Sequence, residues 1–350
     1  VSTRKELEHK GFNLCFACQT LEVDEIMSHV KVVEANSKFK VGNVEAEYIP
    51  TPHIPGAASI RLAGLNSKKT LLYSGDLGSG TSPFLPAQQP LGDADYLIVE
   101  GTYGTAVYPP NPLARLEFQK YIGEQIKMGK RVVIPAFVLD RSQQVLAELS
   151  AGLQSGTIPK NTKIKMYSPN AVRLTDLYLK LRAPSMRAYF SDAFITKGPY
   201  PKSILTAQKK RGQLEDLKHG EIGITSSGMA DYASSLESVK TWVEDPNTVF
   251  VLVGYQDPDS IGSSLLRNAH STIVIDGQAY SPKGEVRKFD CFSAHANYGQ
   301  IRDLVKGMPS LKKALLVHSD FTDDLKAEYS KDFPGVDFVA PESWTLLNFN

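Results

Sequence analysis

Cysteine and long apolar runs are scarce in this chain, and each shortage excludes a class of protein. Three cysteines among 350 residues cannot build the disulfide framework of a small secreted domain. Cys15 and Cys18 form a C-x-x-C pair, but only Cys291 remains to join them, and a structural zinc site needs four ligands. No apolar run approaches the ~20 residues of a membrane span, and the chain does not start with a signal-peptide pattern. We therefore expect reduced thiols, no membrane partner and a cytoplasmic location.

The chain also lacks an excess of positive or negative charge, because its formal net charge is +1. No overall basic field points to nucleic acid, although a local groove can be basic on a neutral protein. Hydrophobic residues make up 42% of the chain and charged residues 22%, which is ordinary for a globular protein with a core. At about 150 residues per domain, this length predicts about two domains.

Apolar runs typical of buried strands alternate with helical periodicity along most of the chain. The strands are expected at 70–76, 95–101, 131–137, 163–169, 221–228, 248–255, 289–295 and 313–320. The helices are expected at Leu113–Met128, Ser142–Leu153, Ala171–Leu181 and Ser235–Glu244. This alternation predicts an α/β architecture with buried sheets.

Two breaks in the pattern divide the chain into segments. "YPPNP" at 108–112 is a proline-rich joint, and "DGQAYSPKGEV" at 276–286 is a polar stretch that contains glycine and proline. A segment bounded by two such joints is typical of an inserted domain whose flanks form one domain together. We expect boundaries at 1–105, 106–286 and 287–350.

Five residues that bind metals or carry protons stand at or just after the expected strands. They are His53, Asp76, Glu100, His295 and His318. In open α/β sheets, ligands bind outside the carboxyl ends of the strands, so these five could share one crevice. Imidazoles and carboxylates are the ligands that zinc takes when no thiolate is used. Taken alone, each is more typical of a structural histidine, a turn or a solvated acid, and the residues by themselves leave both interpretations open.

Eight motifs in order resemble the β-CASP branch of the metallo-β-lactamase-fold nucleases, which includes bacterial RNase J. They are "PHIPGAAS", "LLYSGDLG", "LIVEGTYG", "IPAFVLDRSQQVL", "MYSPNAVRLTDLY", "ITSSGMADYASSLESVKTW", "GYQDPDSIGSSLL", and "FSAHANYGQIRDLV" followed by "ALLVHSD". The resemblance runs through nearly the whole chain. It implies a metallo-β-lactamase αββα fold, N-terminally incomplete, with an inserted α/β β-CASP domain.

The resemblance also implies roles in a reaction that uses two zinc ions. His53 would bind the first zinc ion, Asp76 would bridge both, and His318 would bind the second. His295 would protonate the leaving oxygen, oriented by Glu100. An imidazolium beside a carboxylate is a suitable acid at neutral pH, and two metals suit an in-line displacement at phosphorus.

The expected substrate is single-stranded RNA, because a histidine at the His318 position resembles the RNA-acting members of the family. The turn formed by Ser226, Ser227 and Gly228 offers N–H groups and hydroxyls for phosphate. Arg141 either contacts phosphate as well or braces the joint between the domains. Both interpretations stay open for Arg141.

One motif of the family is absent. Enzymes of this fold carry H-x-H-x-D-H near the N-terminus, and no such run occurs here. Either the chain is a fragment of an active zinc-dependent ribonuclease, or it is a non-catalytic RNA-binding or scaffold subunit. A DNA nuclease is a third alternative. The missing ligands would come from an N-terminal companion segment or a partner, and a homodimer is another expected arrangement.

Smaller departures from the family pattern affect four positions. Asp140 stands where glycine is usual, and Gln144 where glutamate is usual. Ser263 replaces an arginine, which puts one substrate contact in doubt, and Asn297 replaces an aspartate after His295.

Overall fold

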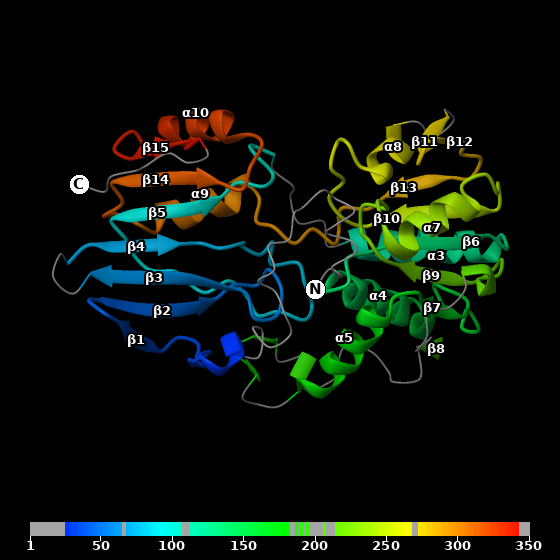
Figure 1. Cartoon of the computed structure of the whole chain (residues 1–350), viewed down its shortest axis with the longest axis horizontal. Coiled ribbons are helices and arrows are strands. Elements are labelled where there is room, and N and C mark those ends of the chain that lie inside the picture. The colour runs from blue at the N-terminus through cyan, green and yellow to red at the C-terminus, as the bar shows by residue number, and fades with distance from the viewer. Residues whose placement is uncertain are drawn as a thin grey trace.

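Two sheets, each covered by helices, organise the computed structural model (Figure 1). The structure describes residues 25–64, 68–106, 113–182, 186–187, 189–191, 194–195, 206–207, 214–267 and 272–342. Cys15 and Cys18 lie outside these residues. The α/β class expected from the sequence is confirmed. No helix in the described part of the chain is long and apolar enough to cross a membrane.

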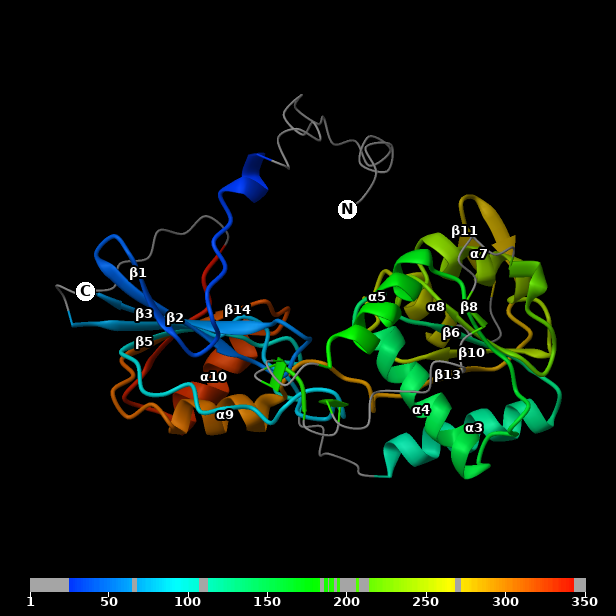
Figure 2. The same ribbon diagram turned by 90° about the horizontal axis from the view of Figure 1, so that it is seen from below.

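The first sheet has seven strands in the order β1-β2-β3-β4-β5-β14-β15. Their bounds are β1 Lys38–Val41, β2 Val44–Pro50, β3 Ala58–Gly64, β4 Thr70–Tyr73, β5 Tyr96–Glu100, β14 Lys313–Val317 and β15 Asp337–Val339. Helices α9 (Tyr298–Lys306) and α10 (Thr322–Asp332) cover one face of this sheet (Figure 2). Leu72, Leu97 and Leu316 on that face are buried in one core with Ile301 and Leu325 of the helices.

Strand direction in the first sheet decides which side chains meet. Strands β4, β5 and β14 are parallel to one another. Strand β2 is antiparallel to β3, which is antiparallel to β4, so β2 runs in the same direction as β4. The carboxyl ends of β2, β4, β5 and β14 therefore lie at one edge of the sheet.

The second sheet has six strands in the order β13-β10-β6-β9-β7-β8, and every pair is parallel. Their bounds are β6 Arg131–Pro135, β7 Ile164–Met166, β8 Thr206–Ala207, β9 Ile222–Thr225, β10 Thr248–Leu252 and β13 Val286–Lys288. Val132 and Ile134 enter one core and Val133 enters another on the opposite face. Burial on both faces explains the continuous apolar runs in the sequence.

The second region, which contains the six-stranded sheet, has four helices that follow the predicted periodicity closely: α3 Ala114–Lys127, α4 Arg141–Ser155, α5 Pro169–Lys180 and α7 Ala233–Trp242. Helix α8 (Ile261–Arg267) and a short 3-10 helix, η3 (Leu214–Asp216), were not predicted. A two-stranded sheet pairs β11 (Ile273–Ile275), just before the stretch predicted as a polar joint, with β12 (Gln278–Tyr280), which lies within that stretch.

The strand predicted at 289–295 is wrong. Strand β13 ends at Lys288, and the chain then crosses without regular structure to the first region, which contains the seven-stranded sheet. Phe289 and Phe292 anchor this crossover, because both rings pack edge-on against Phe118 of α3. These two aromatic residues gave the segment its strand-like apolar pattern, but they bind a helix instead of a neighbouring strand.

Sheet membership changes after Lys288, because β13 pairs with β10 of the second sheet. The predicted boundary between 286 and 287 falls inside β13. We keep the division into three segments as a proposal, with the second junction moved to the crossover after Lys288.

Candidate active site

Glu100 and His295 form a hydrogen-bonded pair at the carboxyl edge of the first sheet. Glu100 is the last residue of β5 and is 2% exposed, and its Oε2 lies 2.8 Å from His295 Nδ1. Its Oε1 accepts the Leu77 N–H at 2.5 Å, and its Oε2 also accepts the Thr102 hydroxyl at 2.6 Å. Burial opposes ionisation, but the hydrogen bonds from these three residues outweigh it and keep the pKa of Glu100 below its usual value. An ionised carboxylate only accepts, so His295 Nδ1 carries a proton and Nε2 faces away from Glu100.

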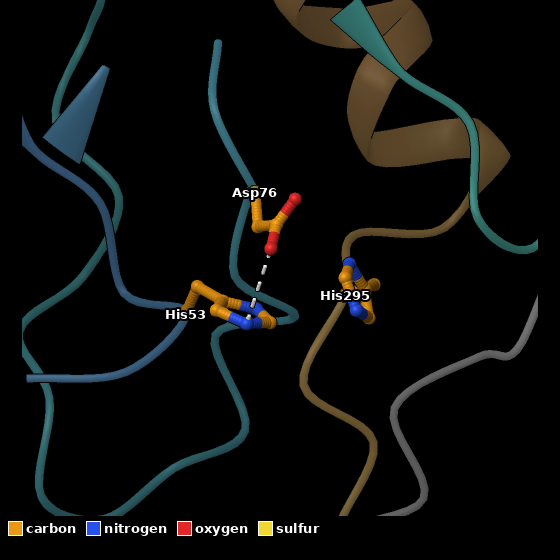
Figure 3. Close-up of side chains that lie close together, drawn as sticks. All are labelled: His53, Asp76 and His295. Carbon is orange, nitrogen blue, oxygen red and sulfur yellow. Dashed lines mark ion pairs between the residues drawn. The ribbon is translucent and has the colours of Figure 1, made fainter. Parts of the chain in front are cut away.

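Asp76 lies between two imidazoles, one beside each carboxylate oxygen. His53 Nε2 is 3.7 Å from Asp76 Oδ2, and His318 Nδ1 is 3.4 Å from Asp76 Oδ1. Figure 3 shows His53, Asp76 and His295 close together. The ring centroids of the two histidines lie 4.5 Å apart. Burial, and then the neighbouring His295, lower the pKa of His53. A neutral His53 has a free lone pair for a metal ion.

His318 follows β14 in an uncommon backbone conformation. Its φ is 54°, in the left-handed region that non-glycine residues rarely adopt. The strand ends at Val317, and this turn brings the imidazole beside Asp76. Such outliers concentrate at functional sites, where the surrounding structure holds them.

The donor atoms fit part of a metal site. The ligand atoms of His53, Asp76 and His295 lie within 4.8 Å of one another, and so do those of Glu100, His295 and His318. His53 Nδ1 is buried, and none of the described residues forms a hydrogen bond with it. Nitrogen and oxygen donors of this kind suit Zn²⁺. The three expected ligands are too few for two ions with three protein ligands each.

Thr102 is a site residue that the sequence analysis missed. Its Oγ1 lies 2.6 Å from Glu100 Oε2, 3.2 Å from His295 Nδ1 and 3.2 Å from His318 Nδ1. A hydroxyl has one proton and two lone pairs, so donation to Glu100 leaves it free to accept from both imidazoles. Thr102 stands two residues after Glu100 in "EGTYG", and this spacing was the available signal.

The loop after Asp76 is joined to the crossover segment by backbone contacts. Gly78 and His295 form an antiparallel bridge, and the Ser79 N–H donates to the Ala294 carbonyl at 2.9 Å. A Cβ on Gly78 would lie 2.0 Å from the Pro52 carbonyl oxygen, so a larger residue does not fit there. This contact holds the segments that carry His53, Asp76 and His295 against one another.

The expected phosphate-binding residues lie in the second region, apart from this cluster. Ser226, Ser227 and Gly228 follow β9 and are buried, and the two serine N–H groups already donate to Ser234 Oγ and the Tyr232 carbonyl. The structure thus gives these N–H groups internal partners. Their role toward phosphate stays a prediction.

Arg141 is almost completely buried at the start of α4. Its Nε and Nη1 have no hydrogen-bond partner among the described residues. Asp140 raises and burial lowers the pKa of Arg141, and burial prevails. Such a position suits the bracing role better than an open phosphate contact.

Two family models match the chain, and together they span more than half of it. The Beta-Casp domain matches residues 142–265, and the Zn-dependent metallo-hydrolase RNA specificity domain matches residues 281–341. The fold is therefore that of a metallo-β-lactamase-type protein with a β-CASP insertion. The chain belongs to the β-CASP family of metallo-β-lactamase-fold nucleases, as the resemblance implied.

Three curated relatives are similar over most of the chain. Ribonuclease TTHA0252 of Thermus thermophilus is 26% identical over 85% of this chain and 68% of its own length. Probable RNase MJ4 of Methanocaldococcus jannaschii is 28% identical over 81% of this chain and 64% of its own length. RNase aCSPSF2 of Saccharolobus solfataricus is 26% identical over 92% and 62%. The chain thus spans about two thirds of the length of these relatives.

Proposed function

We propose that this chain belongs to a zinc-dependent ribonuclease that hydrolyses phosphodiester bonds of single-stranded RNA. The observation that carries the proposal is the pairing of His295 with the buried Glu100 at 2.8 Å, beside an Asp76 that has an imidazole next to each oxygen. Relatives named as ribonucleases and a family model named for RNA specificity support RNA as the substrate. Cytoplasmic location and a homodimer stay predictions.

His295 is the proton donor in this proposal. Glu100 fixes the ring through Nδ1 and stabilises the imidazolium, so Nε2 can deliver a proton to the departing ribose oxygen. Thr102 limits rotation of the same ring through its contact with Nδ1. The geometry would also allow His295 to bind a metal ion. Because Nδ1 is bonded to Glu100, only Nε2 is left, either to bind metal or to donate a proton, and we assign it to proton donation.

His53, Asp76 and His318 would hold the metal ions in the proposed enzyme. Bound zinc would supply a Lewis acid and lower the pKa of a water molecule near the phosphate. Burial keeps His53 neutral, and the two oxygens of Asp76 face different histidines, which suits a bridging carboxylate. The remaining ligands would come from residues outside this set.

A non-catalytic RNA-binding subunit is the second candidate. The small number of donors favours it, because three residues do not complete two zinc sites. Such a subunit would have no use for the proton-transfer pair. The presence of Glu100 and Thr102 around His295 therefore favours the enzyme.

Zinc content and RNA cleavage distinguish the two candidates. The experiment uses the protein together with the segment or partner that supplies the remaining ligands, and it measures zinc per chain by mass spectrometry and cleavage of a labelled single-stranded RNA. Bound zinc together with cleavage that a chelator abolishes is the result expected of the enzyme. RNA binding without zinc and without cleavage would contradict the enzyme and support the subunit.

A further inference from the structure

A cavity of about 370 Å³ lies where the carboxyl edges of the two sheets face each other. Thr102 and Tyr103 follow β5, and Phe321 follows β14, so the first sheet supplies one wall. Tyr255 follows β10 and Lys288 ends β13, so the second sheet supplies the other. Ligand pockets start at roughly this volume and favour the carboxyl edges of α/β sheets.

Phe321 occupies a position that folding alone does not explain. It is the N-cap residue of α10, where serine, threonine, aspartate or asparagine is favoured, and its side chain makes no cap hydrogen bond. The ring is 48% exposed and lines the cavity. A phenylalanine here gives up a capping hydrogen bond and leaves an aromatic face open to solvent.

Gly104 supports the Phe321 ring from the side. A Cβ on Gly104 would lie 2.8 Å from Phe321 Cβ and Cγ, so the ring rests directly on the glycine backbone. Gly104 also has a φ of 55°, which favours glycine. The ring is therefore held in place although it is half exposed.

The rest of the wall is aromatic and polar. Tyr103 and Tyr255 add two more aromatic side chains, and Lys288 adds an ammonium group that is paired with Asp290 at the rim. Tyr103 packs edge-on against the His295 ring, with 5.9 Å between centroids. A molecule in this cavity would thus lie beside the proposed proton donor.

We propose that this aromatic cavity binds one nucleobase of the RNA, next to the phosphate that is cleaved. Phe321 supplies the stacking face, and Tyr103 and Tyr255 enclose the base from the first and second sheet. Stacking on an aromatic side chain tolerates any base, so the cavity adds affinity without requiring a particular sequence. The inference rests on the proposed ribonuclease function, because it names how the same site holds its substrate.

A comparison of RNA with an abasic oligomer tests the cavity. Fluorescence anisotropy in a chelating buffer, where cleavage is prevented, measures the affinity of a short single-stranded RNA and of an oligoribonucleotide of equal length without bases. Phe321→Leu keeps apolar bulk but loses the aromatic face, and Phe321→Tyr keeps both. Val274→Ala removes an exposed apolar group of β11 and is the control.

The proposal expects Phe321→Leu to weaken RNA binding about 5- to 150-fold while leaving the abasic oligomer unaffected. Phe321→Tyr and Val274→Ala should bind both oligomers like the unaltered chain. Equal weakening of both oligomers by Phe321→Leu, or no weakening of either, would overturn the base-binding cavity and leave the ribonuclease proposal standing. An unaltered chain that binds neither oligomer would overturn both.

Discussion

Asp76 and Asp245 both lie beside histidines, but they are bonded in different ways. Asp245 accepts hydrogen bonds from Arg131 at 2.7 Å, Thr248 at 2.8 Å and His219 at 3.0 Å. Asp76 has imidazole nitrogens at 3.4 and 3.7 Å, and its side chain is 43% exposed. Buried polar groups are normally fully bonded when their role is structural. The short contacts of Asp245 thus mark a stabilising site, and the long contacts of Asp76 leave its oxygens available for a ligand.

The two histidine–carboxylate pairs differ in burial and position, although both have short contacts. His295 bonds to Glu100, which is nearly inaccessible, whereas His219 is largely exposed and bonds to Asp245 at the amino-terminal end of β10. His295 of the first pair lines a cavity of about 620 Å³, whereas neither residue of the second pair lines it. Distance to a partner alone would not distinguish them, but position at the strand ends does.

Replacing the proposed proton donor should give the largest effect. We expect His295→Ala to lower the rate of RNA cleavage by about 10²- to 10⁴-fold, because the leaving oxygen loses its acid. Zinc content and RNA affinity should stay unchanged. His219→Ala is the matched control, since it breaks the other histidine–carboxylate pair. A His295→Ala protein that cleaves at the normal rate would remove His295 from the mechanism.

Exchanging each aspartate for asparagine tests the comparison itself. We expect Asp76→Asn to weaken zinc affinity by at least about 100-fold, as loss of a direct ligand exceeds the usual loss for an outer partner. Thermal stability without metal should not fall, because none of the described residues donates a short hydrogen bond to the Asp76 carboxylate. Asp245→Asn should retain zinc and lose stability. The same response from both variants would show that contact distance does not separate the two sites.

Thr102 should have a smaller effect than His295 because it acts through its neighbours. Thr102→Val keeps the shape but removes the hydroxyl, and we expect cleavage to fall about 10- to 100-fold from the loss of a hydrogen bond to a charged group. Thr102→Ser should restore most of the activity. Histidine ¹⁵N spectra should report altered ring tautomers in the valine variant alone. Equal activity of the valine and serine variants would limit Thr102 to packing.

Seven strands, β4, β5, β6, β7, β9, β10 and β14, were accessible from the sequence as apolar runs, and Asp76, Glu100 and His318 stand at or shortly after the ends of three of them. Strand β2, which precedes His53, and strand β3 were not predicted. The convergence of the site residues depends on β2 running in the same direction as β4, which the pattern does not reveal. The role of Thr102 could not be predicted, because it follows from distances to three other side chains that the sequence does not give. The prediction of a strand at 289–295 is wrong because the spacing of Phe289 and Phe292 does not reveal that both rings pack on a helix and not beside a strand.

Two departures from the family pattern have a common physical explanation in the structure. Asp140 has a φ of 66°, which suits the glycine usual at this position. Its Oδ2 accepts from the Gln144 amide at 2.5 Å, and burial raises the pKa of Asp140. A glutamate at position 144 would bring a second buried carboxylate against the first. Gln144 is therefore the partner that Asp140 requires, a relation that neither position reveals alone.

The smallest of the predicted effects is a dependence of the free energy of unfolding on pH, which we expect from the Asp245 carboxylate. Burial opposes its ionisation, but hydrogen bonds from His219, the Asn247 N–H and Thr248 prevail and lower its pKa to about 2. An unfolded aspartate has a pKa near ~3.9. The folded state therefore binds fewer protons, so the stabilisation is complete above about pH 4 and is lost as the pH falls from about 4 to 2. Because the side chain is 25% exposed, we expect about 1–2 kcal/mol.

Chemical denaturation at a series of pH values measures this contribution. Asp245→Asn should lose about 1–2 kcal/mol at pH 7 and show a flatter stability curve between about pH 4 and 2. Asp303→Asn is the control, because it removes an exposed ion pair with Lys306 on one helix and should follow the unaltered protein. If Asp245→Asn kept the original slope, its hydrogen bonds would not favour the ionised form. The contrast with Asp76 would then rest on exposure and not on bonding.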